Sequence, residues 1–217
     1  RGAEVVLDAK RDKAERFLMP AAKALRKVDP NVISLMALIL AFLTGVSAYY
    51  SYHYWKLLLP TTAVLVIASG YLDAVDGKVA RISGKANKRG DFIDHVFDRY
   101  ADIFMIGGVA LSGWCDIYLG ILALLGVLMT SYMGTQAQAL GIGRMYAGLL
   151  GRADRIVLMF FVPIFQLLFT AITGDRTFSL LGYEMSIFEL MMAWFAVIGN
   201  ITAVQRAIYT WRELGDR

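Results

Sequence analysis

Residues 73–98 read DAVDGKVARISGKANKRGDFIDHVFD and carry four aspartates, Asp73, Asp76, Asp94 and Asp98, within a hydrophobic chain. The first two are three residues apart and the last two are four apart, so on a helix each pair falls on one face. The polar segment 82–89 predicts a turn, so the two helices should run antiparallel with their carboxylate pairs facing each other. Carboxylates at membrane depth are unfavourable, and we therefore treat these four as a functional site.

Four clustered carboxylates repel one another unless cations neutralise them. Their hard oxygen atoms favour Mg²⁺, Mn²⁺ or Ca²⁺ over zinc. The stretch therefore predicts a divalent-metal site, and four carboxylates are enough for two ions. The alternative is a set of solvated or salt-bridged aspartates at helix ends, and the glycines and the arginine beside them favour the metal site.

Three further residues accompany the aspartates. Gly77 and Gly90 would allow a phosphate or a nucleotide to approach the backbone closely, although glycines also serve helix packing in membranes. Arg81 lies about one turn beyond Gly77 and could place its guanidinium on a phosphate. An isolated arginine here would instead be read as an anchor at the membrane surface.

Composition favours a membrane protein with a single domain's worth of chain. The 217 residues are 58% hydrophobic with a mean hydropathy of +0.54. The single cysteine, Cys115, excludes internal disulfides and carries no metal-binding pattern. We predict an all-α integral membrane protein with six spans, a fold class based on apolar segments of sufficient length. The expected spans are 31–52, 56–82, 91–112, 116–140, 153–173 and 187–212.

The N-terminal segment, 1–30, differs from the membrane domain expected for 31–217. Within it, residues 10–27 place Phe17, Leu18, Ala22 and Leu25 on one face, surrounded by lysines and arginines. This pattern predicts an amphipathic juxtamembrane helix lying in the interface. A soluble linker helix is the alternative.

Basic residues predict the orientation of the bundle. With an even number of spans both termini share a side, and 20 of the 22 lysines and arginines fall on that side. The positive-inside rule then places the aspartates at the cytoplasmic surface of the membrane. A net charge of +4 is better explained by anionic lipid and a phosphorylated substrate than by nucleic acid, for which no motif is present.

The aspartate stretch resembles the signature of the CDP-alcohol phosphotransferase family, D-x-x-D-G-x-x-A-R-x8-G-x3-D-x3-D. The match spans 26 residues and holds at all eight specified positions. The resemblance implies transfer of a diacylglycerol or archaeol phosphate group from a CDP-linked lipid to an alcohol, with release of CMP. It also implies Mg²⁺ or Mn²⁺ as cofactor, and a homodimer. The positions that match are Asp73, Asp76, Gly77, Ala80, Arg81, Gly90, Asp94 and Asp98.

The resemblance also implies a role for each position. Asp73, Asp76 and Asp94 are expected to bind metal, while Asp98 is the expected general base and a further metal contact. The expected CDP-binding residues are Asn31, Asp73, Gly77, Ala80, Arg81 and Gly90. For Asn31 two readings stay open, because either it or Asp29 could cap the first span.

The acceptor is inferred from the region after the fourth expected span. Arg144, Arg152 and Arg155 could grip a phosphate monoester, or could serve as positive anchors at the membrane surface. The pair Arg152-x-x-Arg155 resembles the phosphatidylinositol phosphate synthase branch of the family. The string from Gly134 to Gln138 looks more like the archaeal relatives that make archaetidylinositol phosphate. L-myo-inositol 1-phosphate is therefore the expected acceptor, with glycerol 3-phosphate, serine and another inositol phosphate as alternatives.

Two other classes of membrane protein use clustered carboxylates. Intramembrane prenyltransferases hold Mg²⁺-pyrophosphate on two aspartate pairs, but these lie far apart in sequence. A cation transporter could bind an ion at a helix end, yet it would not require Gly77, Ala80, Arg81 and Gly90 at these positions. Release of CMP from a CDP-lipid would separate all three classes.

Overall fold

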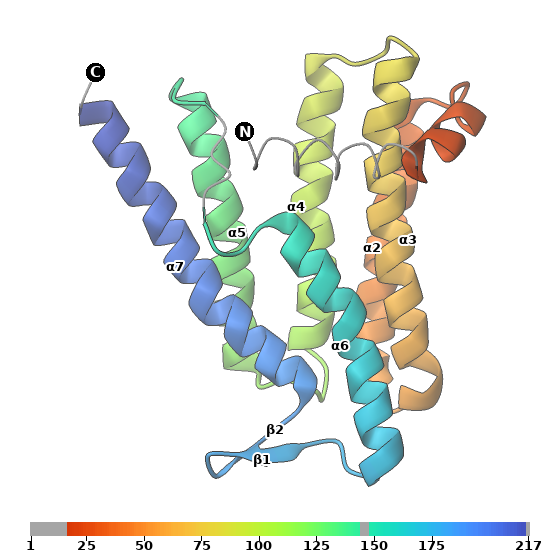
Figure 1. Cartoon of the computed structure of the whole chain (residues 1–217), viewed down its shortest axis with the longest axis vertical. Helices are drawn as coiled ribbons and strands as arrows, with labels where there is room; N and C mark the ends of the chain where they lie inside the picture. The colour runs from red at the N-terminus through yellow and green to blue at the C-terminus, as the bar shows by residue number, and fades with distance from the viewer. Residues whose placement is uncertain (1–16, 144–147, 216–217) are drawn as a thin grey trace, which may run out of the picture. The chain divides into compact units, whose positions relative to one another are not determined.

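A computed structural model describes residues 17–143 and 148–215. Its main elements are six long helices and one small antiparallel hairpin (Figure 1). Residues 17–24 form a further short helix at the N-terminal end of the described chain. The bounds of the main elements are α2 Pro30–Ser51, α3 Trp55–Ile82, α4 Lys88–Ala110, α5 Ile117–Ala139, α6 Arg152–Thr173, β1 Phe178–Leu180, β2 Tyr183–Met185 and α7 Ile187–Gly215.

The predicted fold class, an all-α integral membrane protein, is confirmed, but the count of six spans is not exact. In the described part of the chain, α2, α3, α5, α6 and α7 are long and apolar enough to cross a membrane. The helix α4 is not, because its first half carries Asp91, Asp94 and Asp98 among other charged side chains. The residues that make the candidate site thus remove the apolar character expected of a span.

Helix α3 is longer than a membrane requires. Its 28 residues extend for about 42 Å at 1.5 Å per residue, whereas the hydrocarbon core is about 30 Å thick. Roughly the last eight residues of α3 can therefore stand outside the hydrocarbon. They include Asp76, and Asp73 lies just before them. Polar residues at this end are compatible with a spanning helix for that reason.

The chain forms two compact units, and the first contains the described part of residues 1–40 together with Ala68–Asp98. Its small core consists of Ala22, Ile33, Val75 and Val79. The Ser69 hydroxyl donates a hydrogen bond of 2.8 Å to the Ala37 carbonyl and so joins α3 to α2. The helix at 17–24 packs its apolar face on this core, as expected for an amphipathic helix, while residues 10–16 lie outside the described residues.

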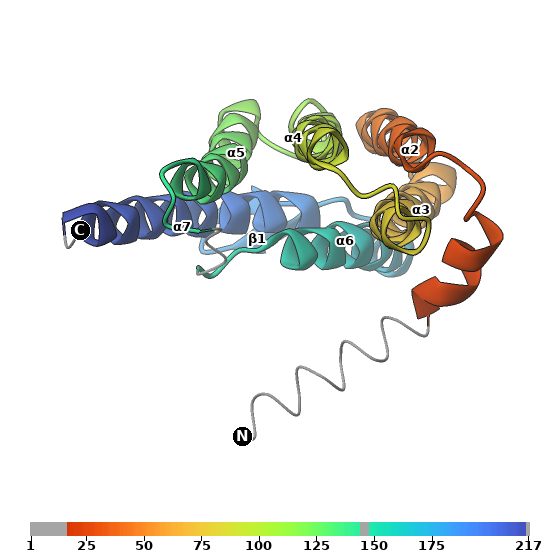
Figure 2. The same ribbon diagram turned by 90° about the horizontal axis from the view of Figure 1, so that it is seen from above.

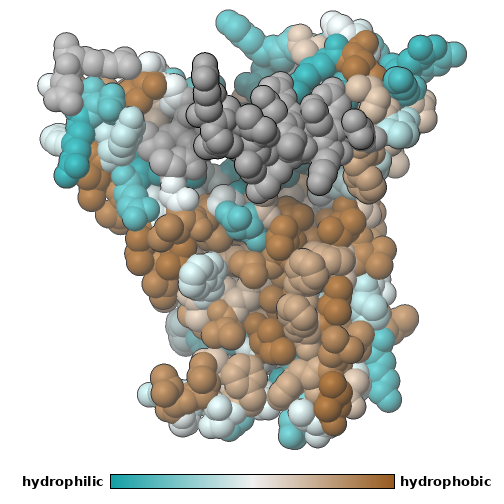
Figure 3. Space-filling model, in the orientation of Figure 1, coloured by the Kyte–Doolittle hydropathy of each residue, from teal (hydrophilic) through white to brown (hydrophobic). Residues whose placement is uncertain are grey.

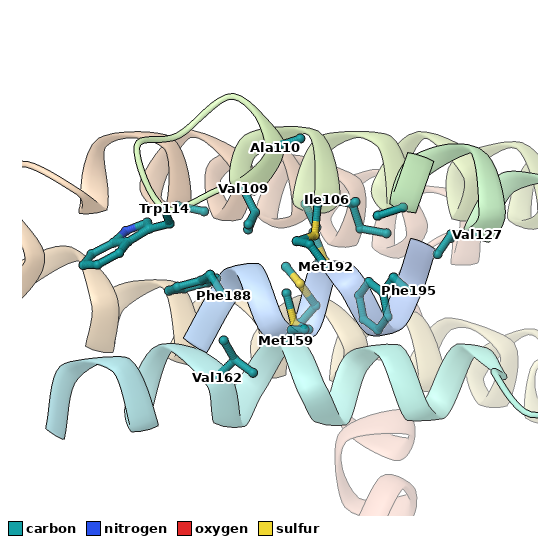
Figure 4. Close-up of a cluster of buried hydrophobic side chains, with 14 of the residues drawn as sticks. Ile106, Val109, Ala110, Trp114, Val127, Met159, Val162, Phe188, Met192 and Phe195 are labelled. Carbon is teal, nitrogen blue, oxygen red and sulfur yellow. The ribbon is translucent and has the colours of Figure 1, made fainter. Parts of the chain in front are cut away.

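The second unit contains Ala41–Ile67 and the described residues from Arg99 onward. Its core combines large apolar side chains from α4, α5, α6 and α7 (Figure 4). Trp114 stacks on Phe188 and donates its indole N–H to the Ser51 hydroxyl at 2.8 Å. Helices α5 and α7 lie side by side along much of their length (Figure 2). Hydrophobic side chains dominate the surface over α6 and the first half of α7, as a lipid-facing surface requires (Figure 3).

Within the second unit α2 and α4 approach each other closely at a pair of glycines. A Cβ atom on Gly108 would overlap the Gly45 carbonyl oxygen, and a Cβ atom on Gly45 would overlap the Phe104 carbonyl oxygen. Small residues commonly allow such close backbone contact between membrane helices. The neighbouring Gly107 differs, because a Cβ atom there would meet nothing within 4 Å.

This contrast supplies a matched pair of substitutions. We expect Gly108→Ala to lower the free energy of unfolding by about 1–3 kcal/mol, the usual effect of overpacking. We expect Gly107→Ala to be neutral or to stabilise by up to about 1 kcal/mol, because alanine favours helix over glycine. Thermal unfolding of both variants in detergent measures the difference, and equal melting temperatures would contradict the close contact.

Candidate functional site

Three aspartates come together in the first unit. Asp73 and Asp76 lie near the C-terminal end of α3, and Asp94 lies in the first half of α4. One carboxylate oxygen from each lies within 4.8 Å of the other two. The short polar turn at 83–87 connects the two helices. It brings Asp94 to Asp73 and Asp76, as the spacing of the aspartates predicts.

The Asp76 carboxylate gives the physical test of whether a cation fits. Asp76 is only 5% exposed, and its Oδ2 has no hydrogen-bond partner among the described residues. A buried carboxylate with one unpartnered oxygen, beside two further carboxylates, is unfavourable unless a positive charge compensates it. A divalent cation with oxygen ligands provides that compensation, and the residues present therefore fit a metal.

Asp98 is set apart from the other three. It lies one turn beyond Asp94 on α4 and is 4% exposed, but it does not belong to the group whose oxygens are within 4.8 Å of one another. The structure therefore places three aspartates as a group and leaves the fourth beside it. Both roles expected for Asp98, as general base and as a further metal contact, stay predictions.

The helical glycines of the stretch lie beside open space. A Cβ atom on Gly77 would meet nothing within 4 Å, and one on Gly90 would meet only the Asn87 Oδ1 atom at 3.9 Å. Neither has a positive φ angle. The fold of the chain itself does not require glycine at either position, so the space beside Gly77 is compatible with close approach of a ligand.

The remaining expected CDP-binding residues belong to the same unit. Asp29 rather than Asn31 caps α2, because its Oδ1 accepts a hydrogen bond of 2.9 Å from the Asn31 N–H. The exposed Asn31 side chain is not required for capping, which favours the nucleotide-binding reading. Arg81 is exposed in the last turn of α3, and Ala80 is half-buried.

The expected acceptor residues belong to the second unit. Arg144 lies outside the described residues, and Arg152 is the first residue of α6. Arg155 is only 3% exposed and donates from Nη2 to both oxygens of Asp102, at 3.2 and 2.9 Å. Its Nε is buried and has no partner among the described residues. Arg155 is therefore held in place by Asp102 and retains one donor for a further anion.

Sequence reasoning missed Arg206 as a site residue. It lies on α7, is 8% exposed, and donates from Nη1 to the Thr130 carbonyl at 2.7 Å. Its charge lies close enough to that of Arg155 for the two to repel. An ionisable residue within a spanning segment is itself a signal of function, and this rule would have drawn attention to Arg206 on α7.

The family model for CDP-alcohol phosphatidyltransferases matches residues 27–202. The chain belongs to this family. A CDP-alcohol phosphatidyltransferase is a transferase of phospholipid biosynthesis, and this one is a multi-pass integral membrane enzyme. The carboxylate group agrees with the divalent cations that the family uses.

Curated relatives and solved structures agree with this membership. The chain is similar to the archaetidylinositol phosphate synthase of Methanothermobacter thermautotrophicus, with 32% identity over 97% of each chain. It is also 27% identical to the phosphatidylinositol phosphate synthase of Streptomyces avermitilis, over 93% of this chain and 80% of the relative. The fold matches that of Mycobacterium tuberculosis phosphatidylinositol phosphate synthase with CDP-DAG bound, with a TM-score of 0.67 and 20% identity over 90% of this chain and 94% of the other. A second structure of that enzyme, with manganese and citrate, gives a TM-score of 0.66 at 21% identity, over 89% and 88% of the two chains.

The open space at Gly77 yields a test of ligand approach in this phosphatidyltransferase. We expect Gly77→Ala to keep or slightly raise the melting temperature, because alanine favours helix by up to about 1 kcal/mol. The added methyl group should nevertheless weaken binding of a CDP-alcohol roughly tenfold or more, equivalent to about 1.4 kcal/mol. Isothermal titration and thermal unfolding measure the two effects separately.

Gly107→Ala is the matched control, since it introduces the same methyl group into an equally open helical position of the other unit. It should likewise keep or slightly raise the melting temperature, but it should leave the affinity for a CDP-alcohol unchanged. Unchanged CDP-alcohol affinity in Gly77→Ala would show that the glycine serves another purpose.

Proposed function

We propose that this enzyme transfers the phosphate-bearing lipid group of a CDP-linked lipid to L-myo-inositol 1-phosphate, releasing CMP. The observation that carries the reaction is the group of three carboxylates on α3 and α4 with the unpartnered Asp76 oxygen. The acceptor is supported by the relatives named as archaetidylinositol phosphate synthases.

Asp73, Asp76 and Asp94 are proposed to hold Mg²⁺ or Mn²⁺, with two ions when Asp98 also contributes. When bound, these ions neutralise the pyrophosphate and stabilise the leaving CMP oxygen. The Asp76 carboxylate also contacts the Ser34 side chain of α2, which belongs to the same unit. A carboxylate held by a neighbouring side chain is positioned before the substrate arrives, and preorganised charge is the usual requirement for electrostatic catalysis.

Asp98 is proposed as the general base. The acceptor hydroxyl attacks the lipid-linked phosphorus, its proton passes to the Asp98 carboxylate, and the bond from phosphorus to the CMP oxygen breaks. The burial of Asp98 and its position outside the group of three aspartates support this division. Arg81 is proposed to hold the CDP phosphates, while Asn31, Gly77, Ala80 and Gly90 are proposed to border the nucleotide.

The proposed acceptor phosphate site rests on charge. In the second unit three arginines, Arg99, Arg155 and Arg206, accompany one aspartate, Asp102. These four side chains carry a formal charge of +2, and Arg155 and Arg206 are almost completely buried. A phosphate monoester carries about −1.5 to −2 charges at pH 7, and guanidinium groups bind such an anion through charge-assisted hydrogen bonds. Arg152 is proposed as a further contact of the same phosphate, and Arg144, which lies outside the described residues, stays a predicted one.

The distribution of basic residues supports an active site on the cytoplasmic side of the membrane. A homodimer and bound membrane lipids also belong to this proposal through the family resemblance. Glycerol 3-phosphate, serine and another inositol phosphate are the alternative acceptors, and a panel of acceptors assayed by CMP release distinguishes them.

The first test removes the metal ion with a chelator and replaces, in separate variants, the proposed base and one proposed metal ligand. Purified enzyme should lose CMP release in EDTA and recover it with Mg²⁺ or Mn²⁺. Asp98→Asn should lower kcat about 10²- to 10⁴-fold, the usual contribution of a general base, while binding of a CDP-alcohol persists. Asp76→Asn should also weaken that binding, because it removes a proposed metal ligand.

Asp91→Asn serves as the control, since Asp91 is an exposed first-turn residue of α4 outside the carboxylate group. It should retain activity. Full activity in metal-free buffer would refute the metal site, and near-normal turnover by Asp98→Asn would refute the assignment of the base alone.

The second test concerns the acceptor. Arg206→Gln and Arg152→Ala should each raise the KM for inositol 1-phosphate roughly 10- to 150-fold, the equivalent of one charge-assisted contact of about 1.5–3 kcal/mol. The KM for the CDP-lipid should change little. Arg155→Lys, which keeps a cation beside Asp102, should also raise the KM for inositol 1-phosphate.

Arg212→Ala is the matched control on α7, because Arg212 is exposed in its last turn. It should leave both KM values unchanged. If the unmodified enzyme used inositol and inositol 1-phosphate equally well, the phosphate-binding role of these arginines would be wrong while the transfer reaction itself would stand.

A further inference from the structure

The β1–β2 hairpin has one apolar and one polar face. Its register pairs Phe178 with Met185, Ser179 with Glu184, and Leu180 with Tyr183. Opposed residues of an antiparallel pair share a face, and faces alternate along each strand. One face therefore carries Phe178, Leu180, Tyr183 and Met185, and the other carries Ser179 and Glu184.

The apolar face is only partly covered by protein. At the base of the hairpin, Phe178 is half-buried and its ring lies 5.9 Å from that of Phe169. Toward the tip, Leu180 is 41% exposed and Tyr183 is 75% exposed. Phe169 lies one turn before the end of α6, inside a segment able to span a membrane. The Phe178 contact therefore turns the apolar face toward the membrane-spanning part of α6.

The turn places a hydrophobic residue where the backbone disfavours it. Leu181 has φ +54° and Gly182 has φ +85°, the combination of a two-residue type I′ turn. The first position of such a turn usually carries Asn, Asp or Gly, because other side chains are strained at positive φ. In this protein the position is occupied by Leu181, whose side chain is 92% exposed. The packing of the chain therefore does not explain an apolar side chain at this position.

The base of the hairpin is fixed to the helices. The buried Gln166 side chain donates to the Arg176 carbonyl at 2.9 Å and accepts from the Ile187 N–H at 2.8 Å. It therefore joins the residues just before and just after the hairpin to the core of α6. On the polar face, Thr177 donates to the Glu184 carboxylate at 3.2 Å. These hydrogen bonds fix the orientation of the apolar and polar faces of the hairpin relative to α6.

We propose that the β1–β2 hairpin lies in the lipid interface, with Leu180, Leu181 and Tyr183 in the boundary between headgroups and acyl chains and with Glu184 facing water. The hairpin connects α6 and α7 (Figure 1), two helices able to span the membrane, so it lies at a membrane surface. Tyrosine is enriched at this depth, and an amphipathic element with one apolar face is suited to lie there. The occupant is the phospholipid bilayer itself.

The test uses an environment-sensitive fluorophore on single cysteines. Leu181→Cys, Tyr183→Cys and the polar-face control Ser179→Cys are prepared with Cys115→Ala and reconstituted in nanodiscs of phosphatidylcholine and phosphatidylglycerol. Burial, together with the negative charges of Glu189 and Asp116, raises the pKa of the Cys115 thiol to about 12. Cys115 should therefore react slowly with the fluorophore near neutral pH. Labelling of the unmodified protein, whose one cysteine is Cys115, verifies this.

Probes at 181 and 183 should be quenched by lipid spin-labelled near the top of the acyl chain and shielded several-fold from aqueous acrylamide. The probe at 179 should show the opposite behaviour. Equal acrylamide access at 179 and 183 would overturn the proposal. Shielding without quenching by labelled lipid would also overturn it, because a protein partner would then cover the face.

Leu181→Asn separates the side chain from the turn. Asparagine is favoured at positive φ, so the melting temperature in detergent should hold or rise while lipid quenching of the probe at 183 falls. Unchanged quenching would remove Leu181 from the proposed contact. Because no arm measures transfer activity, these results are independent of the acceptor and of the proposed reaction.

Discussion

The Asp73, Asp76 and Asp94 carboxylates, whose oxygens lie within 4.8 Å of one another, impose the constraint on which the site and much of the fold depend. Mutual repulsion and the burial of Asp76 oppose this arrangement unless a cation joins it. The aspartates must also reach water to exchange a polar substrate. A long α3 that extends past the hydrocarbon and an α4 with a charged first half meet both conditions.

Helices are well suited to hold these carboxylates. Two of the three lie on α3 and one lies on α4, and a short turn joins these helices. At the start of α4, the Asn87 side chain accepts a hydrogen bond of 3.0 Å from the Gly90 N–H. Ordered helix ends fix the side chains before substrate binds, so little reorganisation is required during transfer. The glycine at 77 leaves room beside the carboxylates that the packing of the chain does not fill.

Patterns within short stretches of sequence predicted much of this structure. Spacings of three and four residues placed the aspartates on matching faces, and apolar length located the long helices within a few residues. The status of α4 was misjudged because its apolar second half resembles a span while its first half carries the site. The Asp102–Arg155 pair and the approach of Arg206 join residues more than fifty positions apart, and only the fold reveals such contacts. The hairpin at 178–185 was also missed, since strands of three residues leave little periodic signal.

The buried arginines bear on selectivity as well as affinity. Arg155 and Arg206 are buried in the second unit, and Asp102 pairs with Arg155 and with Arg99. If a phosphate completes this cluster, an acceptor without phosphate leaves buried positive charge uncompensated. Sites built to bind a polar group reject analogues lacking it far more strongly than apolar pockets reject a missing methylene. Discrimination between a phosphorylated and a neutral acceptor would then arise from the unpaired charge that the neutral molecule leaves behind, and Asp102 would set how large that charge is.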